Sequence, residues 1–201
     1  MADTDGTGAN AIAEEEKKET REIRMTVSSK HLTLSSRVFA AMLANNFREG
    51  RTLNATGSAT ISLPEDKVVP FIILMNIIHA KNRKVPKKVT VPLLASLAII
   101  VDKYEFHDSV APFADSWVKD LEKDIPESVS RYTFYWMAIA WVFEQPKEFY
   151  EIGYVLEQEA VGLNFQYKYG EEFFNGLPIP KKAIGKLCLA EDANGTWLTP
   201  E

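Results

Sequence analysis

Two short stretches in the first third of the chain alternate apolar and polar residues. Residues 23–27 read Ile-Arg-Met-Thr-Val, and residues 59–63 read Ala-Thr-Ile-Ser-Leu. A period of two is typical of a β-strand with one buried face. Pro64 follows the second stretch and cannot donate a ladder hydrogen bond. The pattern therefore predicts two strands, the second of which ends before Pro64.

Most other apolar residues recur at helical spacing. One face, at i, i+3, i+4 and i+8, consists of Phe39, Met42, Leu43 and Phe47. This spacing predicts a helix that Gly50 ends and that Ser35 or Ser36 caps, because a hydroxyl oxygen can accept from a free N–H of the first turn. A shorter helix before it is predicted to begin at Ser28 or Ser29.

The rest of the chain predicts five more helices. Residues 69–78 are apolar at nearly every position, so we expect a helix buried on most sides. A helical stripe also covers residues 93–104, and the next helix carries Trp117. Two further helices, residues 127–143 and 147–160, flank Pro146 and are expected to pack as antiparallel neighbours. The residues expected to form the core are Phe39, Met42, Leu74, Leu97, Val101 and Trp117.

Charge and composition exclude several classes of protein. The chain has 201 residues and a net charge of -5 at pH 7, which argues against non-specific binding to nucleic acid. Its apolar runs are shorter than the roughly 18 residues that a membrane span needs, and its start lacks the pattern of a secretory signal. Cys188 is the only cysteine, which excludes an intramolecular disulfide. We expect a cytoplasmic or nuclear protein that binds neither nucleic acid nor membrane.

The residue types that carry catalysis form no recognisable arrangement. His31, His79 and His107 lie on separate predicted elements and share no metal-ligand spacing. His79 lies near a predicted helix C-terminus, where the helix dipole favours an imidazolium. The sequence has no nucleophile elbow and no phosphate-binding loop. We expect no catalysis, no cofactor and no metal. A concave pocket that holds His31 or His107 beside a carboxylate would support an enzyme instead.

Two segments are candidate surfaces for protein partners. The loop after residues 69–78 is basic, through Lys81, Arg83, Lys84, Lys87 and Lys88. Such a loop is a nuclear-import signal, a contact for an acidic partner, or a solvated connection. The predicted helix 127–143 is apolar on both faces. Its aromatic residues, Tyr135 and Trp136 among them, therefore either form a core between helices or face a partner.

Five short pieces of the chain have the order and spacing of a known family. They are V-S-S-K-H-L at Val27–Leu32, S-x-V-F-x-A-M-L at Ser36–Leu43, L-P-E-D at Leu63–Asp66, N-I-I-H at Asn76–His79 and V-D-K-Y at Val101–Tyr104. Through them the chain resembles BTB/POZ domains over about residues 23–122, and fungal members look closest. The resemblance implies an α+β fold, in which a small sheet caps a helical cluster, and a role in holding other proteins.

The expected organisation combines this resemblance with the composition of the ends. Residues 1–20 are predicted to be a disordered acidic tail, because they have too few apolar residues to form a core. The BTB/POZ-like domain covers residues 21–124, an α-helical extension covers 125–161, and an irregular tail covers 162–201. Family members usually begin with one more strand, where this chain has the charged residues 14–22. We therefore expect that the first strand is missing from a truncated or mis-started chain and that homodimer pairing is weakened.

A triplet after the second predicted helix resembles the cullin-contacting site of BTB adaptors. That site is an apolar-x-Glu triplet, and Phe47-Arg48-Glu49 lies at the corresponding place. Phe47 would fill an apolar pocket of the cullin while Glu49 met a basic or hydroxyl group at its rim. In the alternative, Phe47 completes a helix face and Glu49 is a solvated turn residue.

The sequence therefore predicts a protein–protein interaction module. Our first hypothesis is an adaptor that recruits a partner to a cullin-type ubiquitin ligase, with Phe47, Glu49, Tyr135 and Trp136 as partner-binding residues. The alternative is a self-associating scaffold in a nuclear assembly, and the rival of a different class is an unrecognised enzyme. No second recognisable module is present to select a substrate, so the sequence does not name the target.

Overall fold

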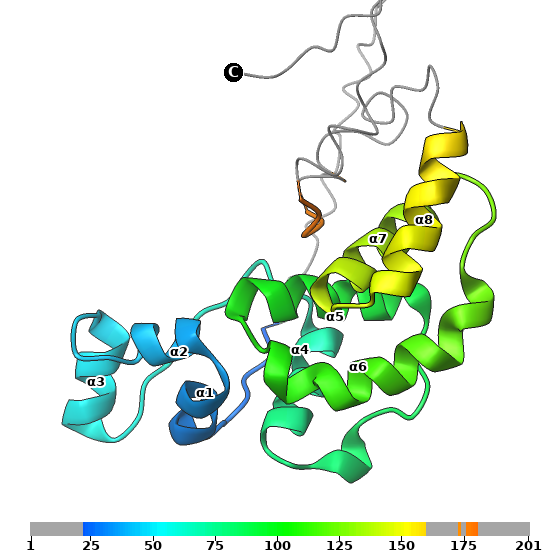
Figure 1. Ribbon diagram of the computed structural model, residues 1–201. Coiled ribbons are helices and arrows are strands. Elements are labelled where there is room, and N and C mark those ends of the chain that lie inside the picture. The colour runs from blue at the N-terminus through cyan, green and yellow to red at the C-terminus, as the bar shows by residue number, and fades with distance from the viewer. Residues whose placement is uncertain (1–21, 160–172, 174–175, 181–201) are drawn as a thin grey trace, which may run out of the picture.

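The computed structural model describes residues 22–159, 173 and 176–180, and its regular elements are helices (Figure 1). Their bounds are α1 Ser29–Ser35, α2 Arg37–Met42, α3 Arg48–Thr56, α4 Val68–Ile78, η1 Asn82–Lys84, α5 Val91–Tyr104, α6 His107–Leu121, η2 Glu122–Asp124, α7 Arg131–Val142 and α8 Pro146–Glu159. The tail expected over residues 1–20 lies outside the described residues. Within the expected C-terminal tail, Leu177 and Ile179 are buried against the core.

The predicted α+β class is wrong, because no strand occurs in the part of the chain that the structure describes. The alternation in residues 59–63 still appears as burial, since its apolar residues are half-buried and the residues between them exposed. Residues 23–27 do not show this burial, and Ile23 is 53% exposed. A period of two specifies one buried face, but a strand also needs a neighbour to complete its hydrogen-bond ladder.

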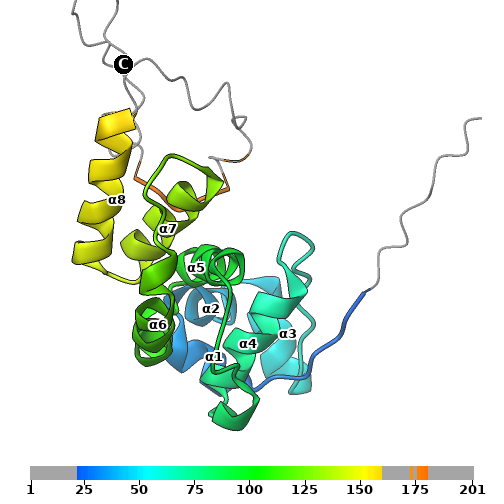
Figure 2. The same cartoon turned by 90° about the vertical axis from the view of Figure 1, so that its right-hand side faces the viewer.

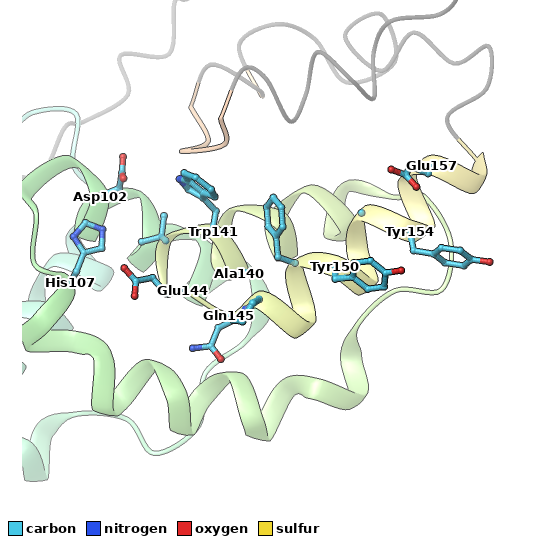
Figure 3. A pocket seen from close by; sticks show the side chains of 13 residues that line it. Asp102, His107, Ala140, Trp141, Glu144, Gln145, Tyr150, Tyr154 and Glu157 are labelled. Carbon is cyan, nitrogen blue, oxygen red and sulfur yellow. The ribbon is translucent and has the colours of Figure 1, made fainter.

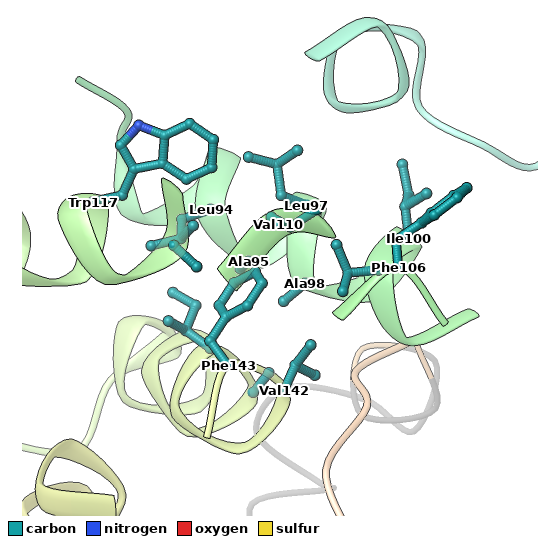
Figure 4. Packing of buried hydrophobic residues seen from close by; sticks show 14 of the residues in the cluster. Leu94, Ala95, Leu97, Ala98, Ile100, Phe106, Val110, Trp117, Val142 and Phe143 are labelled. Carbon is teal, nitrogen blue, oxygen red and sulfur yellow. The ribbon is translucent and has the colours of Figure 1, made fainter. Parts of the chain in front are cut away.

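Helix α5 lies at the centre of the fold. It contacts α2, α4, α6 and α7, while α8 packs on α7 at the outside (Figure 2). Because neighbours surround it, α5 buries residues on most of its circumference, including Leu94, Leu97, Ala98 and Val101. Figure 4 shows these side chains meeting residues of α6 and α7, such as Val110. The helices α1, α2 and α3 form one end of the molecule, and α7 and α8 form the other (Figure 1).

The predicted core is confirmed. Phe39, Leu74, Leu97, Val101 and Trp117 are each no more than 2% exposed and belong to one cluster, against which the half-buried Met42 packs. The indole Nε1 of Trp117 donates to the backbone carbonyl of Pro86 at 2.9 Å. That bond satisfies the one polar atom that Trp brings into a core.

The helix after Ser36 is shorter than its apolar pattern predicts. Ser36 is the predicted cap, and its Oγ accepts from the backbone N–H of Phe39 at 3.0 Å. The helix ends at Met42, however, and Gly50 lies inside the next helix, α3. Phe47 is therefore not part of the same helical face as Phe39.

The predicted antiparallel pair is present as α7 and α8. Ser130 and Thr133 form a capping box at the start of α7, and Pro146 is the first residue of α8, where its missing N–H has no helical partner to lose. Among the described residues, no helix is long and apolar enough to cross a membrane.

Candidate functional site

The sequence pieces are joined in two sets of contacts, and the first set surrounds Tyr104. The Tyr104 hydroxyl donates to Asp66 at 2.5 Å, and Lys103 donates to the other oxygen of the same carboxylate at 2.8 Å. The L-P-E-D and V-D-K-Y pieces are thereby joined. Burial raises the pKa of Tyr104, and the bond to Asp66 and the charges of Asp66 and Glu65 raise it further. Tyr104 is therefore held in its neutral, donating form.

The S-x-V-F piece joins the same network. The hydroxyl of Ser36 donates to the backbone carbonyl of Tyr104 at 2.5 Å while it caps α2. The ring of Phe39 stacks on that of Tyr104 with centroids 4.9 Å apart. Ser36 is only 3% exposed, so its two bonds satisfy a polar group that would otherwise be costly to bury. Helix α2 is thus fixed to the end of α5.

His79 joins the remaining two pieces. Its Nε2 accepts from the backbone N–H of Ser28 at 2.8 Å, and its Nδ1 lies 2.8 Å from the carbonyl of Met75. In this arrangement the ring donates at Nδ1 and accepts at Nε2. It also stacks on His31, with ring centroids 5.0 Å apart. The Ser28 and Met75 backbone groups thus fix the orientation of the His79 ring.

The predicted triplet lies at the corner between α2 and α3. Phe47 is the N-cap residue of α3, and its side chain is 52% exposed. The alternative in which it completes a core-facing helix stripe is therefore wrong. Glu49 lies in the first turn of α3 and is half-buried, and Arg48 is exposed. A carboxylate is favoured at that position by the helix dipole.

The backbone of this corner is tightly packed. Gly50 is buried, and a Cβ at this residue would lie 1.9 Å from the carbonyl oxygen of Ala44 and 2.6 Å from that of Leu43. Phe47 also donates its N–H to the Ala44 carbonyl at 3.2 Å. Any side chain at residue 50 would force α3 away from the turn. Because Gly50 has no side chain, α3 can lie close to the turn that precedes it. This close packing fixes the direction in which Phe47 projects.

The aromatic pair predicted on α7 divides into two environments. Trp136 is completely buried, and its Nε1 donates to the carbonyl of Asp124 at 3.1 Å, so it belongs to the core and presents no surface to a partner. Tyr135 is half-buried, with Tyr132 at 6.0 Å and Phe173 at 5.7 Å between ring centroids. Neither residue lies near Phe47, since α7 and α3 are at opposite ends of the molecule (Figure 1).

One concave surface is a groove that sequence reasoning missed. It has a volume of about 830 Å³ and lies along α8 and the end of α7 (Figure 3). Trp141, Phe149, Tyr150 and Tyr154 supply its aromatic side chains. Trp141 and Phe149 contact each other, with centroids 5.9 Å apart. We call this surface the aromatic groove.

One end of the aromatic groove holds ionisable side chains. Figure 3 shows Asp102 and His107 together at that end and Glu157 at the other. Partial burial raises the pKa of Asp102; the charge of His107 acts in the opposite direction, and that of Glu105 raises the pKa further. Glu144 also lines the groove and has a positive φ of 52°.

This end matches the arrangement that would support an enzyme, since His107 lies in a concave pocket beside carboxylates. A general base must be within hydrogen-bond reach of the group it serves. Among the described residues, no hydrogen bond joins the His107 ring to Asp102 or Glu144, and none of the described residues lining the groove is a Ser, Thr or Cys. The described residues also contain no group of His, Cys, Asp and Glu that could hold a metal.

The basic loop is exposed. Lys81, Arg83, Lys84, Lys87 and Lys88 all face solvent, while Val85 between them is buried and anchors the loop. The carbonyl of Pro86 accepts from Trp117, which fixes the loop to α6. A contact for an acidic partner and a solvated connection both fit this geometry.

The sequence of α8 contains a pattern that indicates the aromatic groove. Tyr150, Tyr154 and Glu157 share one face of α8, whereas Ile152 and Leu156 share another that is buried. A helix with two aromatic or apolar faces can turn only one of them toward its partner helix. Comparison with protein-family models, curated proteins and solved structures finds no match for this chain, so its function is inferred from its own residues.

Proposed function

We propose that this chain is a protein–protein interaction adaptor whose α2–α3 corner binds a cullin-type ubiquitin-ligase scaffold. The observation that carries the proposal is the exposure of Phe47, which is 52% exposed at the N-terminus of α3 with Glu49 two residues further on in the first turn. An exposed aromatic side chain on a rigid corner is the type of residue that anchors interfaces. The sequence pieces that resemble BTB/POZ domains support the same proposal, because one of them ends in α2 and is bonded through Ser36 to Tyr104 and so to Asp66.

A substitution of Phe47 should affect binding without affecting folding. The side chain is not among the buried core residues, and α3 is held to the turn by Gly50 and by the Phe47 backbone. Truncation of the ring should therefore leave the fold intact. If the ring inserts into the cullin, its removal should weaken binding by about 2 kcal/mol or more, as for an interface anchor.

The test measures binding of the full chain to a purified cullin N-terminal fragment by calorimetry. Phe47→Ala should lose binding and keep the wild-type melting temperature. Glu49→Lys should also lose binding, because a reversed charge at an interface repels, and should lower the melting temperature only slightly through the lost favourable charge in the first turn of α3. Tyr132→Ala and Glu127→Lys are matched controls, since Tyr132 is 49% exposed, Glu127 is exposed and neither lies at the corner. A folded wild type that does not bind, or equal binding by all variants, rejects the proposal.

A self-associating scaffold is the second candidate, and exposed apolar residues on α4 favour it. Val69 is 60% exposed, and Val68 and Ile72 are each 37% exposed, on a helix whose other residues are buried or half-buried. Such residues mark interfaces when they gather in a patch. Light scattering at micromolar concentration separates the candidates: a tight dimer that Val69→Asp dissociates supports the scaffold, and a monomer removes it.

An acid–base activity is the candidate from a different class, favoured by His107 and Asp102 in the aromatic groove. It would need the two groups to come within hydrogen-bond reach around a bound substrate. The test is turnover of a panel of nitrophenyl esters, phosphates and glycosides. Turnover that disappears in His107→Asn would establish this activity, and the absence of turnover by the wild type leaves the adaptor proposal ahead.

A further inference from the structure

The aromatic groove exposes more aromatic surface than a helix pair normally leaves to water. Tyr150 is 76% exposed, Tyr154 is 56% exposed and Trp141 is 49% exposed, and all three line one concavity. The pair does not need these rings for its own packing, because Ile152 and Leu156 are fully buried on the other face of α8. Clustered Tyr and Trp side chains on a concave surface are typical of sites that bind a partner.

Gly153 keeps the centre of the aromatic groove open. It lies in the interior of α8, where Gly destabilises a helix relative to Ala because it loses more backbone freedom on folding. No packing reason accounts for it, since a Cβ at Gly153 would meet nothing within 4 Å. Glycine is suited to places where another chain approaches a backbone closely. Gly153 lines the groove, so a bound chain would lie directly against the helix at this residue.

The charges around the groove determine whether a ligand should be cationic or anionic. Asp102, Glu144 and Glu157 line it and are exposed, and neither Lys nor Arg is among its described lining residues. Acidic side chains beside aromatic faces attract a cation twice, through the carboxylate charge and through the ring quadrupole. The same carboxylates and aromatic faces would repel an anionic ligand.

We propose that the aromatic groove binds a linear peptide segment of a partner protein that carries Lys or Arg beside a large apolar side chain. The apolar side chain packs on Trp141 and Phe149, and the cation lies between Tyr154 and Glu157. This proposal rests on the proposed function, in which an adaptor needs a second surface for the protein that it recruits. The groove and the α2–α3 corner are at opposite ends of the molecule, so both can be occupied together (Figure 1).

The experiment selects binders from a library of random linear peptides displayed on phage, with the full chain as bait. We expect enriched peptides to contain Lys or Arg adjacent to an aromatic or aliphatic residue. The best peptide is then synthesised with a fluorescent label, and its affinity is measured by anisotropy at low and high salt. Replacement of its basic residues by Glu should abolish binding, and added salt should weaken it because exposed charges are screened.

Two variants at one residue separate groove binding from folding. Gly153→Leu places a side chain in the groove and should weaken peptide binding at least about tenfold, since it occupies the space of the bound chain. Gly153→Ala should weaken binding less than Gly153→Leu does, because a methyl group fills less of that space. Glu151→Leu, at an exposed residue of α8 outside the groove, is the control and should bind within about twofold of the wild type. Glu157→Lys should weaken binding about fivefold, as expected for loss of an exposed charge pair.

The outcomes distinguish this proposal from the function on which it rests. Peptide binding that Gly153→Leu removes and Phe47→Ala preserves supports the aromatic groove, whatever the cullin assay gives. A failure to enrich peptides, enrichment of acidic or uncharged ones, or binding that is equal in Gly153→Leu and the wild type overturns the proposal. A cullin-binding chain that enriches no peptide retains the adaptor function and loses only the groove.

Discussion

Two regions of this molecule, the end of α5 and the outer face of α8, use the same kind of side chain in opposite ways. Tyr104 is 3% exposed, and its hydroxyl is bonded to Asp66 inside a network that joins three of the sequence pieces. Tyr154 is 56% exposed on α8, beside other aromatic residues that line the groove. Around Tyr104 the aromatic side chains are used to hold the fold. Along α8 the exposed aromatic side chains are not required for the packing of the fold.

This difference means that stability and binding should separate by region. A substitution in the motif network removes contacts that the folded state requires, so its effect should appear in denaturation experiments. A substitution in the aromatic groove removes surface that water already covers, so its effect should appear in binding experiments. Matched substitutions of one residue type in each region test that division.

The largest effect is expected from a matched pair of tryptophans. Trp117 is 2% exposed, so Trp117→Ala should lower the free energy of unfolding by about 3 to 5 kcal/mol, the usual cost of a large cavity. Trp141 is 49% exposed and contacts Phe149, so Trp141→Ala should cost about 1 kcal/mol or less. Urea denaturation of both variants measures this. Equal costs would mean that Trp141 supports the fold as Trp117 does and that the two regions do not differ.

A pair of glycines should give effects of opposite sign. Gly50→Ala forces a methyl group against the carbonyl oxygens of Ala44 and Leu43, so it should destabilise the chain by about 2 to 3 kcal/mol. Gly153→Ala adds a methyl group in open space within a helix and should stabilise the chain by about 0.5–1 kcal/mol. The measurement is the denaturation midpoint of each variant. A stable Gly50→Ala variant would show that α3 can move away from the corner, and the defined position of Phe47 would be lost.

A smaller effect is expected at Tyr104, together with a pH dependence. Tyr104→Phe leaves the Asp66 carboxylate without its hydroxyl donor and should cost about 2 kcal/mol, the usual contribution of a hydrogen bond to a charged group. Tyr150→Phe is the matched control on the exposed face of α8 and should cost almost nothing. If both cost the same, the Asp66 bond does not distinguish the two regions.

The sign of the pH dependence follows from the raised pKa of Tyr104 in the folded chain. Below about pH 10 the phenol is neutral in the folded and the unfolded chain, so the stabilisation is fully present. Above that pH the unfolded chain loses the proton first, and stability should fall by up to about 1.4 kcal/mol per pH unit until the folded chain also ionises. Tyr104→Phe should show a shallower alkaline decline than the wild type. Identical declines would exclude this phenol as the cause.

The contrast between the regions also explains which predictions from sequence succeeded. Helical spacing correctly predicted the core, including Phe39 and Trp117, because apolar periodicity fixes which face of a helix is buried. Helical spacing failed where the length of a helix or the burial of a side chain depends on a neighbouring element. The helix after Ser36 was predicted to reach Gly50, but the chain turns after Met42 and packs Gly50 directly on the turn. Trp136 was predicted as a partner-binding residue, but α5 and the Asp124 carbonyl enclose it.

The sequence by itself determined most of the helices, their buried faces, a cap at Ser35 or Ser36 and the motif pieces, because these depend on residue spacing within about ten positions. Helix α3, Arg48–Thr56, was not predicted, since Leu53 is the only large apolar residue in it. Tertiary structure alone decided whether residues 59–63 would find a strand partner, that Phe47 would project from a corner, and that α8 would leave a second aromatic face uncovered. The physical reason is that local pattern specifies which side chains prefer burial. Which of them are buried depends on whether another part of the chain can reach and cover them.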